Sequence, residues 1–127
     1  MRSGVGYDVH AFVIGEILVL GGVQIEHDKG LVGHSDGDAL IHAIIDSILG
    51  AAGLGDIGIH FPSDAPQLEG IASTTLLKKV KEKVESAGYG TIFIDATIIA
   101  QNPRMTPYIS SMKKILSRII EIDSESI

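Results

Sequence analysis

Residue types that bind metal ions stand close together near the start of the chain. The run V-G-Y-D-V-H-A-F (residues 5–12) places Asp8 two positions before His10, and His42 follows later. Side chains two apart in a strand point to the same face, so Asp8 and His10 would lie side by side. One carboxylate and two imidazoles suit Zn²⁺, and three protein ligands leave a fourth tetrahedral position open, as in catalytic zinc sites.

Each part of this set also has a plainer interpretation. A D-x-H pair often arises by chance, and His42 fits the solvated face of a helix, one turn from Asp38 and from Asp46. The chain has no cysteine, so a transition-metal site has to be built from histidine and carboxylate ligands. A shared site further requires the N-terminal strand to lie beside the start of the helix that carries His42.

The polar run G-H-S-D-G-D (33–38) precedes that helix and suggests an anion site. Free backbone N–H groups at a helix N-terminus favour phosphate, and Ser35 adds a hydroxyl donor next to His34. A simple capping turn explains the same residues equally well. If both sites exist, a metal with an open position stands next to an anion site, and a phosphate oxygen becomes the natural fourth ligand.

Three apolar runs predict the strands that position these groups. Residues 2–10 form the first, in which Gly4 and Gly6 allow close backbone approach, and residues 17–25 form the second, bent at its glycine pair. Residues 91–100 are β-branched and nearly all apolar, which predicts a buried strand.

Helical periodicity predicts three helices. The first follows the polar run, with Ser35 or Asp36 as its N-cap, and the others span 72–87 and 108–120. Residues 53–66 are rich in glycine and proline and predict a mobile loop. The expected fold is α+β, a two-layer α/β sandwich in which a mixed β-sheet carries helices on one face. The positions expected to be buried on the first two helices are Ile41, Ile44, Ile45, Ile48, Ala52, Leu76, Leu77, Val80 and Val84.

Length and composition narrow the class of protein. The 127 residues favour one domain, and 45% hydrophobic with 20% charged residues is typical of a globular chain. A net charge of −6 argues against a nucleic-acid partner, which calls for a basic face. The sequence has no apolar run of roughly 18 residues and no signal-peptide core, so no membrane partner and a cytoplasmic location are expected.

Four blocks of the sequence together resemble one enzyme family. They are G-V-G-Y-D-V-H-A-F at 4–12, H-S-D-G-D at 34–38 with His42 following, G-D-I-G-I-H-F-P at 55–62, and D-A-T-I-I-A-Q-N-P-R-M at 95–105. In this order and spacing they are similar to the 2-C-methyl-D-erythritol 2,4-cyclodiphosphate synthase family of the non-mevalonate isoprenoid pathway. The resemblance runs from residue 1 to about residue 120.

The resemblance implies a metal-dependent lyase. In the family reaction the 2-phosphate of 4-diphosphocytidyl-2-C-methyl-D-erythritol 2-phosphate attacks the β-phosphorus of the diphosphate, CMP leaves, and the cyclic diphosphate forms. Asp8, His10 and His42 would bind one Zn²⁺ per subunit, and its open position would take a β-phosphate oxygen. A second ion, Mg²⁺ or Mn²⁺, would bridge the α- and β-phosphates, and His34 would be the catalytic residue that stabilises the transition state.

The resemblance also implies which residues contact the substrate. Residues 56–58 would bind the erythritol hydroxyls, and residues 61–65 would continue that wall, although this chain has Asp64 where many members carry an acid one position to either side. Residues 100–106 would form the cytosine pocket. The implied substrate-binding set is Asp8, Val9, His10, His34, Ser35, Asp56, Ile57, Gly58, Phe61, Pro62, Ser63, Asp64, Ala65, Ala100, Gln101, Asn102, Pro103, Arg104, Met105 and Thr106.

The implied assembly is a homotrimer whose sheets pack around a central axis and whose active sites lie between subunits. Residues 1–127 would form a single catalytic domain that lacks a C-terminal segment of about thirty residues seen in relatives. The residues alone are also compatible with two other functions. One is a zinc-dependent phosphohydrolase, in which metal-bound water attacks the substrate, and the other is a non-catalytic trimer that binds phosphate or a prenyl diphosphate.

Overall fold

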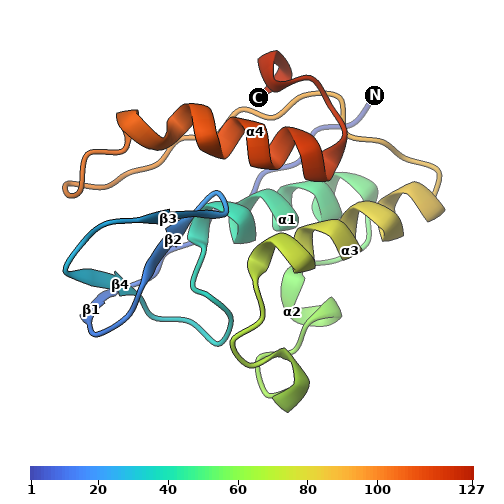
Figure 1. Cartoon of the computed structure of the whole chain (residues 1–127). Coiled ribbons are helices and arrows are strands. Elements are labelled where there is room, and N and C mark those ends of the chain that lie inside the picture. Colours follow the sequence, from blue (N-terminus) through green and yellow to red (C-terminus); the bar gives the residue numbers. More distant parts are fainter.

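The computed structural model describes residues 1–127 and has the expected α+β composition (Figure 1). Short strands occupy the N-terminal third of the chain, and the helices follow, with a long extended segment between the last two α-helices. The strands are β1 (Phe12–Ile14), β2 (Leu18–Leu20), β3 (Val23–Ile25) and β4 (Lys29–Leu31). The α-helices are α1 (Ala39–Ala52), α2 (Ile57–His60), α3 (Ser73–Ser86) and α4 (Ile109–Ile120), and 3₁₀ turns are η1 (Pro66–Leu68), η2 (Thr106–Tyr108) and η3 (Ser124–Ser126).

The strands form two separate antiparallel pairs rather than one mixed sheet. β1 pairs with β4, with Phe12 opposite Leu31, and β2 pairs with β3. The strand expected over 17–25 is therefore a hairpin. Gly21 and Gly22 both have positive φ, 58° and 75°, which tight hairpin turns require and which glycine adopts without steric cost.

The strands expected at 2–10 and 91–100 are wrong for the single chain. Both segments are extended, but neither forms a ladder with a neighbouring strand. Within 91–100 the only backbone hydrogen bond is the one that Ile94 N–H donates to the Ser126 carbonyl, at 2.9 Å. β-branched composition favours an extended backbone, but a strand also needs a partner edge, which local sequence does not specify.

The helices follow the apolar periodicity of the sequence closely. All nine positions expected to be buried on α1 and α3 are buried. α1 starts later than expected, because its N-cap is Asp38, whose carboxylate accepts from Ile41 N–H, rather than Ser35 or Asp36. The helix ends at Gly53 in the left-handed conformation, as is typical of a C-cap. None of the helices combines the length and the apolar character needed to cross a membrane.

The main core lies between α1, α3 and α4. α1 and α3 lie side by side, and α4 packs against α3 and the β2–β3 hairpin (Figure 1). Buried apolar side chains of all three helices form one cluster in this core. A smaller cluster under the hairpin is formed by Leu18, Leu20, Ile25, Leu31 and Met112. These two clusters hold α1, the helix that carries His42, in place.

Candidate metal and phosphate site

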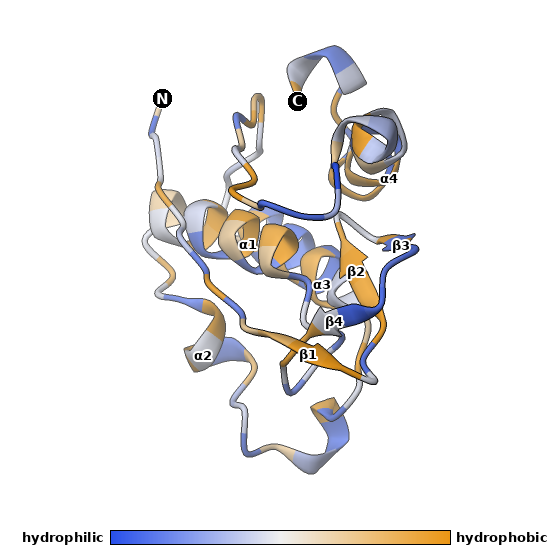
Figure 2. Ribbon diagram, turned by 90° about the vertical axis from the view of Figure 1, so that its left-hand side faces the viewer, coloured by the Kyte–Doolittle hydropathy of each residue, from blue (hydrophilic) through white to orange (hydrophobic).

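The N-terminal segment runs along α1 (Figure 2). A Cβ atom built on Gly4 would lie 1.9 Å from the Ser47 carbonyl oxygen, and one on Gly6 would lie 1.8 Å from that of Ala43. The backbone therefore touches α1 directly, as the two glycines predicted. In this segment the side chains alternate, with Asp8 turned toward the helix and its odd-numbered neighbours exposed.

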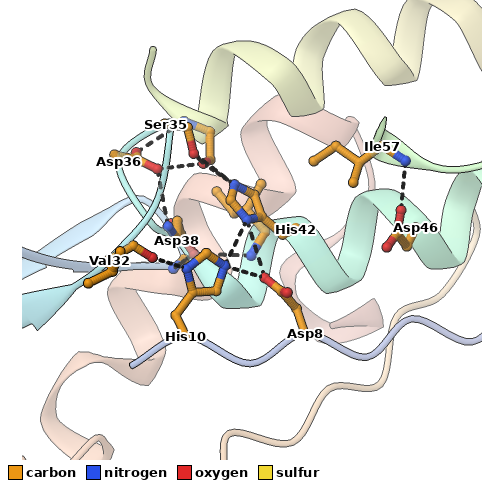
Figure 3. A network of polar contacts seen from close by, with 12 residues as sticks. Asp8, His10, Val32, Ser35, Asp36, Asp38, His42, Asp46 and Ile57 are labelled. Carbon is orange, nitrogen blue, oxygen red and sulfur yellow. Dashed lines mark hydrogen bonds and ion pairs between the residues drawn. The ribbon is translucent and has the colours of Figure 1, made fainter. Parts of the chain in front are cut away.

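Asp8, His10 and His42 converge at the first turns of α1, as predicted from the sequence (Figure 3). Asp8 Oδ2 lies 2.7 Å from His10 Nε2 and 3.2 Å from His42 Nδ1. The two ring nitrogens are 3.3 Å apart. Ligands on a tetrahedral zinc ion, with bonds of about 2.0–2.1 Å, stand roughly 3.3 Å from one another. The three side chains thus form a possible metal site.

The hydrogen-bonding partners of His10 show that its Nε2 is free of a proton when the ring is neutral. His10 Nδ1 contacts the Val32 carbonyl oxygen, which can only accept, so Nδ1 carries the hydrogen. The lone pair of Nε2 then faces Asp8 and His42. Electron-pair donors that converge in this way repel one another unless a cation lies between them, so the donor set fits a divalent metal ion.

His42 contacts Asp8 and His10 on one side of its ring and a second group of polar side chains on the other. Burial lowers the pKa of the His42 imidazole, an effect that the nearby Asp8 carboxylate partly offsets. The neutral ring that this favours is the form that binds metal. On its other side, His42 Nε2 lies 2.9 Å from Ser35 Oγ and 2.9 Å from Ser73 Oγ. Ser35 was expected near the phosphates, whereas nothing in the sequence pointed to Ser73, the first residue of α3.

The loop that carries His34 and Ser35 is held by the chain between α2 and α3. Gly70 N–H donates to the His34 carbonyl at 2.8 Å, and Asp36 N–H donates to the Ile71 carbonyl at 3.2 Å. The His34 ring contacts the Ala65 carbonyl through Nε2, at 3.2 Å. The structure therefore joins the predicted phosphate loop to residues 61–65, the predicted extension of the erythritol wall.

Asp38 and Asp46, which flank His42 on α1, do not share its polar site. The Asp38 carboxylate is fully buried and accepts from Gly21 N–H at 3.0 Å and Gly22 N–H at 2.8 Å, besides capping α1. Burial raises the pKa of Asp38 to about 6, although its backbone hydrogen bonds act in the opposite direction. Asp38 thus ties the β2–β3 turn to the helix start.

Asp46 positions the segment predicted to bind erythritol. Its Oδ1 accepts from Ile57 N–H at 2.8 Å, which places α2 beside α1 one turn beyond His42 (Figure 3). Asp56 caps α2 by accepting from Ile59 N–H at 2.9 Å. The loop expected over 53–66 thus contains a one-turn helix. Gly58 and Asp56 are exposed, while Ile57 packs on the core.

The remaining residues predicted to contact the substrate lie in two segments, 61–65 and 100–106. Pro62, Ser63 and Asp64 are exposed in the turn after α2, and Phe61 packs against the core. Residues 100–106 lead into the N-terminal end of α4, well away from α2 (Figure 1). None of the hydrogen bonds in the structure links residues 100–106 to Asp8, His10 or His42.

Comparison with known proteins decides the family. The YgbB family model matches residues 1–127. The chain belongs to the YgbB family. The YgbB relative 2-C-methyl-D-erythritol 2,4-cyclodiphosphate synthase of Clostridium acetobutylicum is 55% identical over 127 residues, which is 100% of this chain and 82% of the relative. The enzyme of the same name from Desulforamulus reducens is 50% identical over 127 residues, 100% of this chain and 81% of that one.

Solved structures agree with this assignment to the YgbB family. The bifunctional IspDF of Campylobacter jejuni matches with a TM-score of 0.94 and 40% identity, over 99% of this chain and 34% of that one. A 2C-methyl-D-erythritol-2,4-cyclodiphosphate synthase in a CDP-bound form matches with a TM-score of 0.92 and 34% identity, over 99% of this chain and 84% of that one. The family resemblance in the four sequence blocks is thereby confirmed.

Proposed function

We propose that this chain is a phosphorus–oxygen lyase that forms 2-C-methyl-D-erythritol 2,4-cyclodiphosphate from 4-diphosphocytidyl-2-C-methyl-D-erythritol 2-phosphate and releases CMP. A 2-phosphate oxygen forms a bond to the β-phosphorus, and the bond between that phosphorus and the oxygen of CMP breaks. The observation that carries the proposal is the convergence of Asp8, His10 and His42 beside the loop of His34 and Ser35. The named relatives support the same activity.

Zn²⁺ is the metal that best fits this cluster. Two imidazole nitrogens and one carboxylate oxygen are the donor set of catalytic zinc sites, and no fourth His, Cys, Asp or Glu joins the group. A bound Zn²⁺ would supply Lewis-acid stabilisation of the negative charge on a phosphoryl oxygen. A second ion, Mg²⁺ or Mn²⁺, would be held mainly by the substrate's own α- and β-phosphates, as is common for Mg²⁺.

The chain's own residues would bind and fold the substrate. Nucleophile and electrophile belong to one molecule, so the enzyme has to hold a flexible anion in a reactive shape, which is worth several kcal/mol, up to about 7–11 in well-oriented cases. His34 would contact the phosphates and Ser35 would help to hold one, while the Asp56 carboxylate with the backbone of Ile57 and Gly58 would hold the erythritol hydroxyls. The hydrogen bond that Ile57 N–H donates to the Asp46 carboxylate would hold that wall next to the helix that carries His42.

The cytosine pocket would come from residues 100–106 of a neighbouring subunit. Two observations support this proposal: these residues are separated from α2 within one chain, and apolar side chains are exposed along the two unpaired extended segments. A homotrimer with shared sites would cover those side chains and complete each site. The substrate would then be enclosed by two subunits, with its phosphates on one and its base on the other.

A product assay tests the proposed reaction. The protein is incubated with the cytidine substrate, Zn²⁺ and Mg²⁺, and ³¹P NMR follows the phosphates. The expected result is cyclic diphosphate and CMP in equal amounts. Linear hydrolysis products would instead establish the phosphohydrolase, and binding without turnover would establish the non-catalytic trimer. The His42→Ala variant is the control, because it should lose zinc and turnover while circular dichroism shows an unchanged helix content.

A further inference from the structure

Two residues outside the metal cluster form a hydrogen-bonded chain to His42. Ser73 Oγ lies 2.9 Å from His42 Nε2 and 2.5 Å from Asp36 Oδ1. Asp36 in turn accepts from Ser73 N–H at 3.0 Å and from Asp38 N–H at 3.2 Å. Ser73 is fully buried, so no solvent competes for its hydroxyl. These contacts join α1, α3 and the phosphate loop at one point (Figure 3).

The direction of the hydrogen bonds follows from counting protons. A serine hydroxyl has one hydrogen to donate, and an ionised carboxylate can only accept. The Ser73 hydrogen therefore goes to Asp36, and Ser73 Oγ must accept at its contact with His42. The hydrogen of that contact belongs to His42 Nε2, which leaves the lone pair of His42 on Nδ1, the nitrogen that faces Asp8 and His10.

We propose that Ser73 and Asp36 are positioning residues that hold His42 in the tautomer and ring orientation required of a metal ligand. This inference rests on the proposed function, because it assigns the metal to the same cluster. Metal-binding histidines commonly donate their second ring N–H to an oxygen acceptor, and loss of that acceptor typically costs about 10- to 100-fold in metal affinity. Here the acceptor is the buried Ser73 hydroxyl, which donates its own hydrogen to the Asp36 carboxylate.

Ser35 does not duplicate this role. Its Oγ is also 2.9 Å from His42 Nε2, but its other partner is the Ser73 hydroxyl, at 3.4 Å, and no carboxylate takes up its hydrogen. Its hydroxyl can therefore donate to the ring as well as accept from it. Without Ser73, both tautomers of His42 would find a partner, and the Nδ1–H form would have to move its hydrogen to Nε2 before Nδ1 could bind a metal.

The first test reads the tautomer directly. Long-range ¹H–¹⁵N NMR of the metal-free protein above the titration range of the imidazoles reports which ring nitrogen carries the hydrogen. The wild-type chain should show His42 as the Nε2–H form, and Ser73→Ala should show a mixture. A wild-type Nδ1–H form, or a Ser73→Ala spectrum identical to the wild-type one, would overturn the inference.

The second test measures Zn²⁺ affinity by competition with a chromophoric chelator. Ser73→Ala should bind about 10- to 100-fold more weakly. Thr75→Ala is the matched control, because it removes an exposed hydroxyl from the same turn of α3 and should bind as the wild type does. If Ser73→Ala does not fold, Asp36→Asn carries the test, since it keeps the serine but removes the charge, and it too should bind more weakly. Wild-type affinity in the folded variant would refute the proposal.

The two proposals fail separately. If the wild-type chain gives no turnover but Ser73→Ala still shifts the tautomer and weakens Zn²⁺ binding, the lyase assignment falls and the positioning role stands. If turnover is normal and Ser73→Ala binds Zn²⁺ like the wild type, only the positioning role falls.

Discussion

At the scale of single residues, Gly6 controls how closely Asp8 and His10 approach His42. A Cβ atom added at Gly6 would lie 1.8 Å from the Ala43 carbonyl oxygen. Because that oxygen belongs to the backbone of α1, the clash could be relieved only if the N-terminal segment and the helix moved apart. Gly6→Ala should therefore lift the N-terminal segment from α1, weaken Zn²⁺ binding by at least about tenfold and cost about 1–3 kcal/mol of stability. Isothermal calorimetry with Zn²⁺ and urea denaturation would measure the two effects.

Gly50→Ala is the matched control for Gly6→Ala. Gly50 is exposed on the same helix, and an added Cβ would meet nothing within 4 Å. Alanine there should leave Zn²⁺ affinity unchanged and stabilise the chain by about 0.5–1 kcal/mol, because glycine is a poor helix former. Equal zinc affinities for Gly6→Ala and the wild type would show that close contact with α1 is not needed.

The three metal-ligand candidates were recognisable from the sequence, but their hydrogen-bonding partners were not. Asp8 and His10 share a face because side chains alternate along an extended segment, and this is local information. Ser73 contacts His42 only because α3 packs beside α1, and a serine at a helix start ordinarily suggests a cap. Contacts of this kind depend on packing between distant segments, which spacing along the chain does not reveal.

At the scale of elements, Asp38 joins the β2–β3 turn to α1, and the pKa of its carboxyl group should be unusually high. Burial raises its pKa from 3.8 to about 6, so the native state holds this proton more tightly than the unfolded chain. Its contribution to the free energy of unfolding is therefore full below about pH 4 and declines by about 3 kcal/mol as the pH rises through about 6. The difference in stability between the wild type and Asp38→Ala should shrink over that range.

Carboxyl ¹³C NMR would check this pKa directly. The Asp38 resonance should titrate with a midpoint near pH 6, whereas exposed aspartates titrate near 4. A midpoint near 4, or a stability difference from Asp38→Ala that is constant between pH 4 and 7, would mean that the hydrogen bonds from Gly21, Gly22 and Ile41 outweigh the cost of burial.

Helices were predicted more accurately than strands for a physical reason. α3 and α4 begin and end within about a residue of the expected bounds, because an amphipathic helix satisfies its own backbone and carries its core-facing pattern locally. The N-cap of α1 was expected at Ser35 or Asp36 but is Asp38, because all three residue types can cap a helix and they stand within four positions. Residues 2–10 and 91–100 have the composition of strands, but pairing depends on which segments lie beside them.

At the scale of the whole molecule, exposed apolar side chains gather on the two unpaired extended segments. Their backbones also offer free hydrogen-bonding groups, which favours association with another chain. Val5, Tyr7 and Val9 are 91%, 78% and 69% exposed in the N-terminal segment, and Ile92, Phe93 and Ile99 are 67%, 64% and 90% exposed in the other. These surfaces are consistent with the proposed trimer.

Multi-angle light scattering tests the assembly. The proposed homotrimer should give a mass about three times the 13.4 kDa of one chain. The same sample should be assayed for turnover, because a site shared between subunits cannot work in a monomer. A monodisperse monomer with full activity would contradict the shared site.

Anomalous diffraction from zinc-soaked crystals would show whether Asp8, His10 and His42 bind one metal ion. The expected result is a single anomalous peak bonded to the Asp8 carboxylate, His10 Nε2 and His42 Nδ1 at about 2.0–2.2 Å, with a fourth position left for substrate or solvent. A map in which these three side chains point apart, with no peak between them after soaking, would contradict both the site and the lyase mechanism built on it.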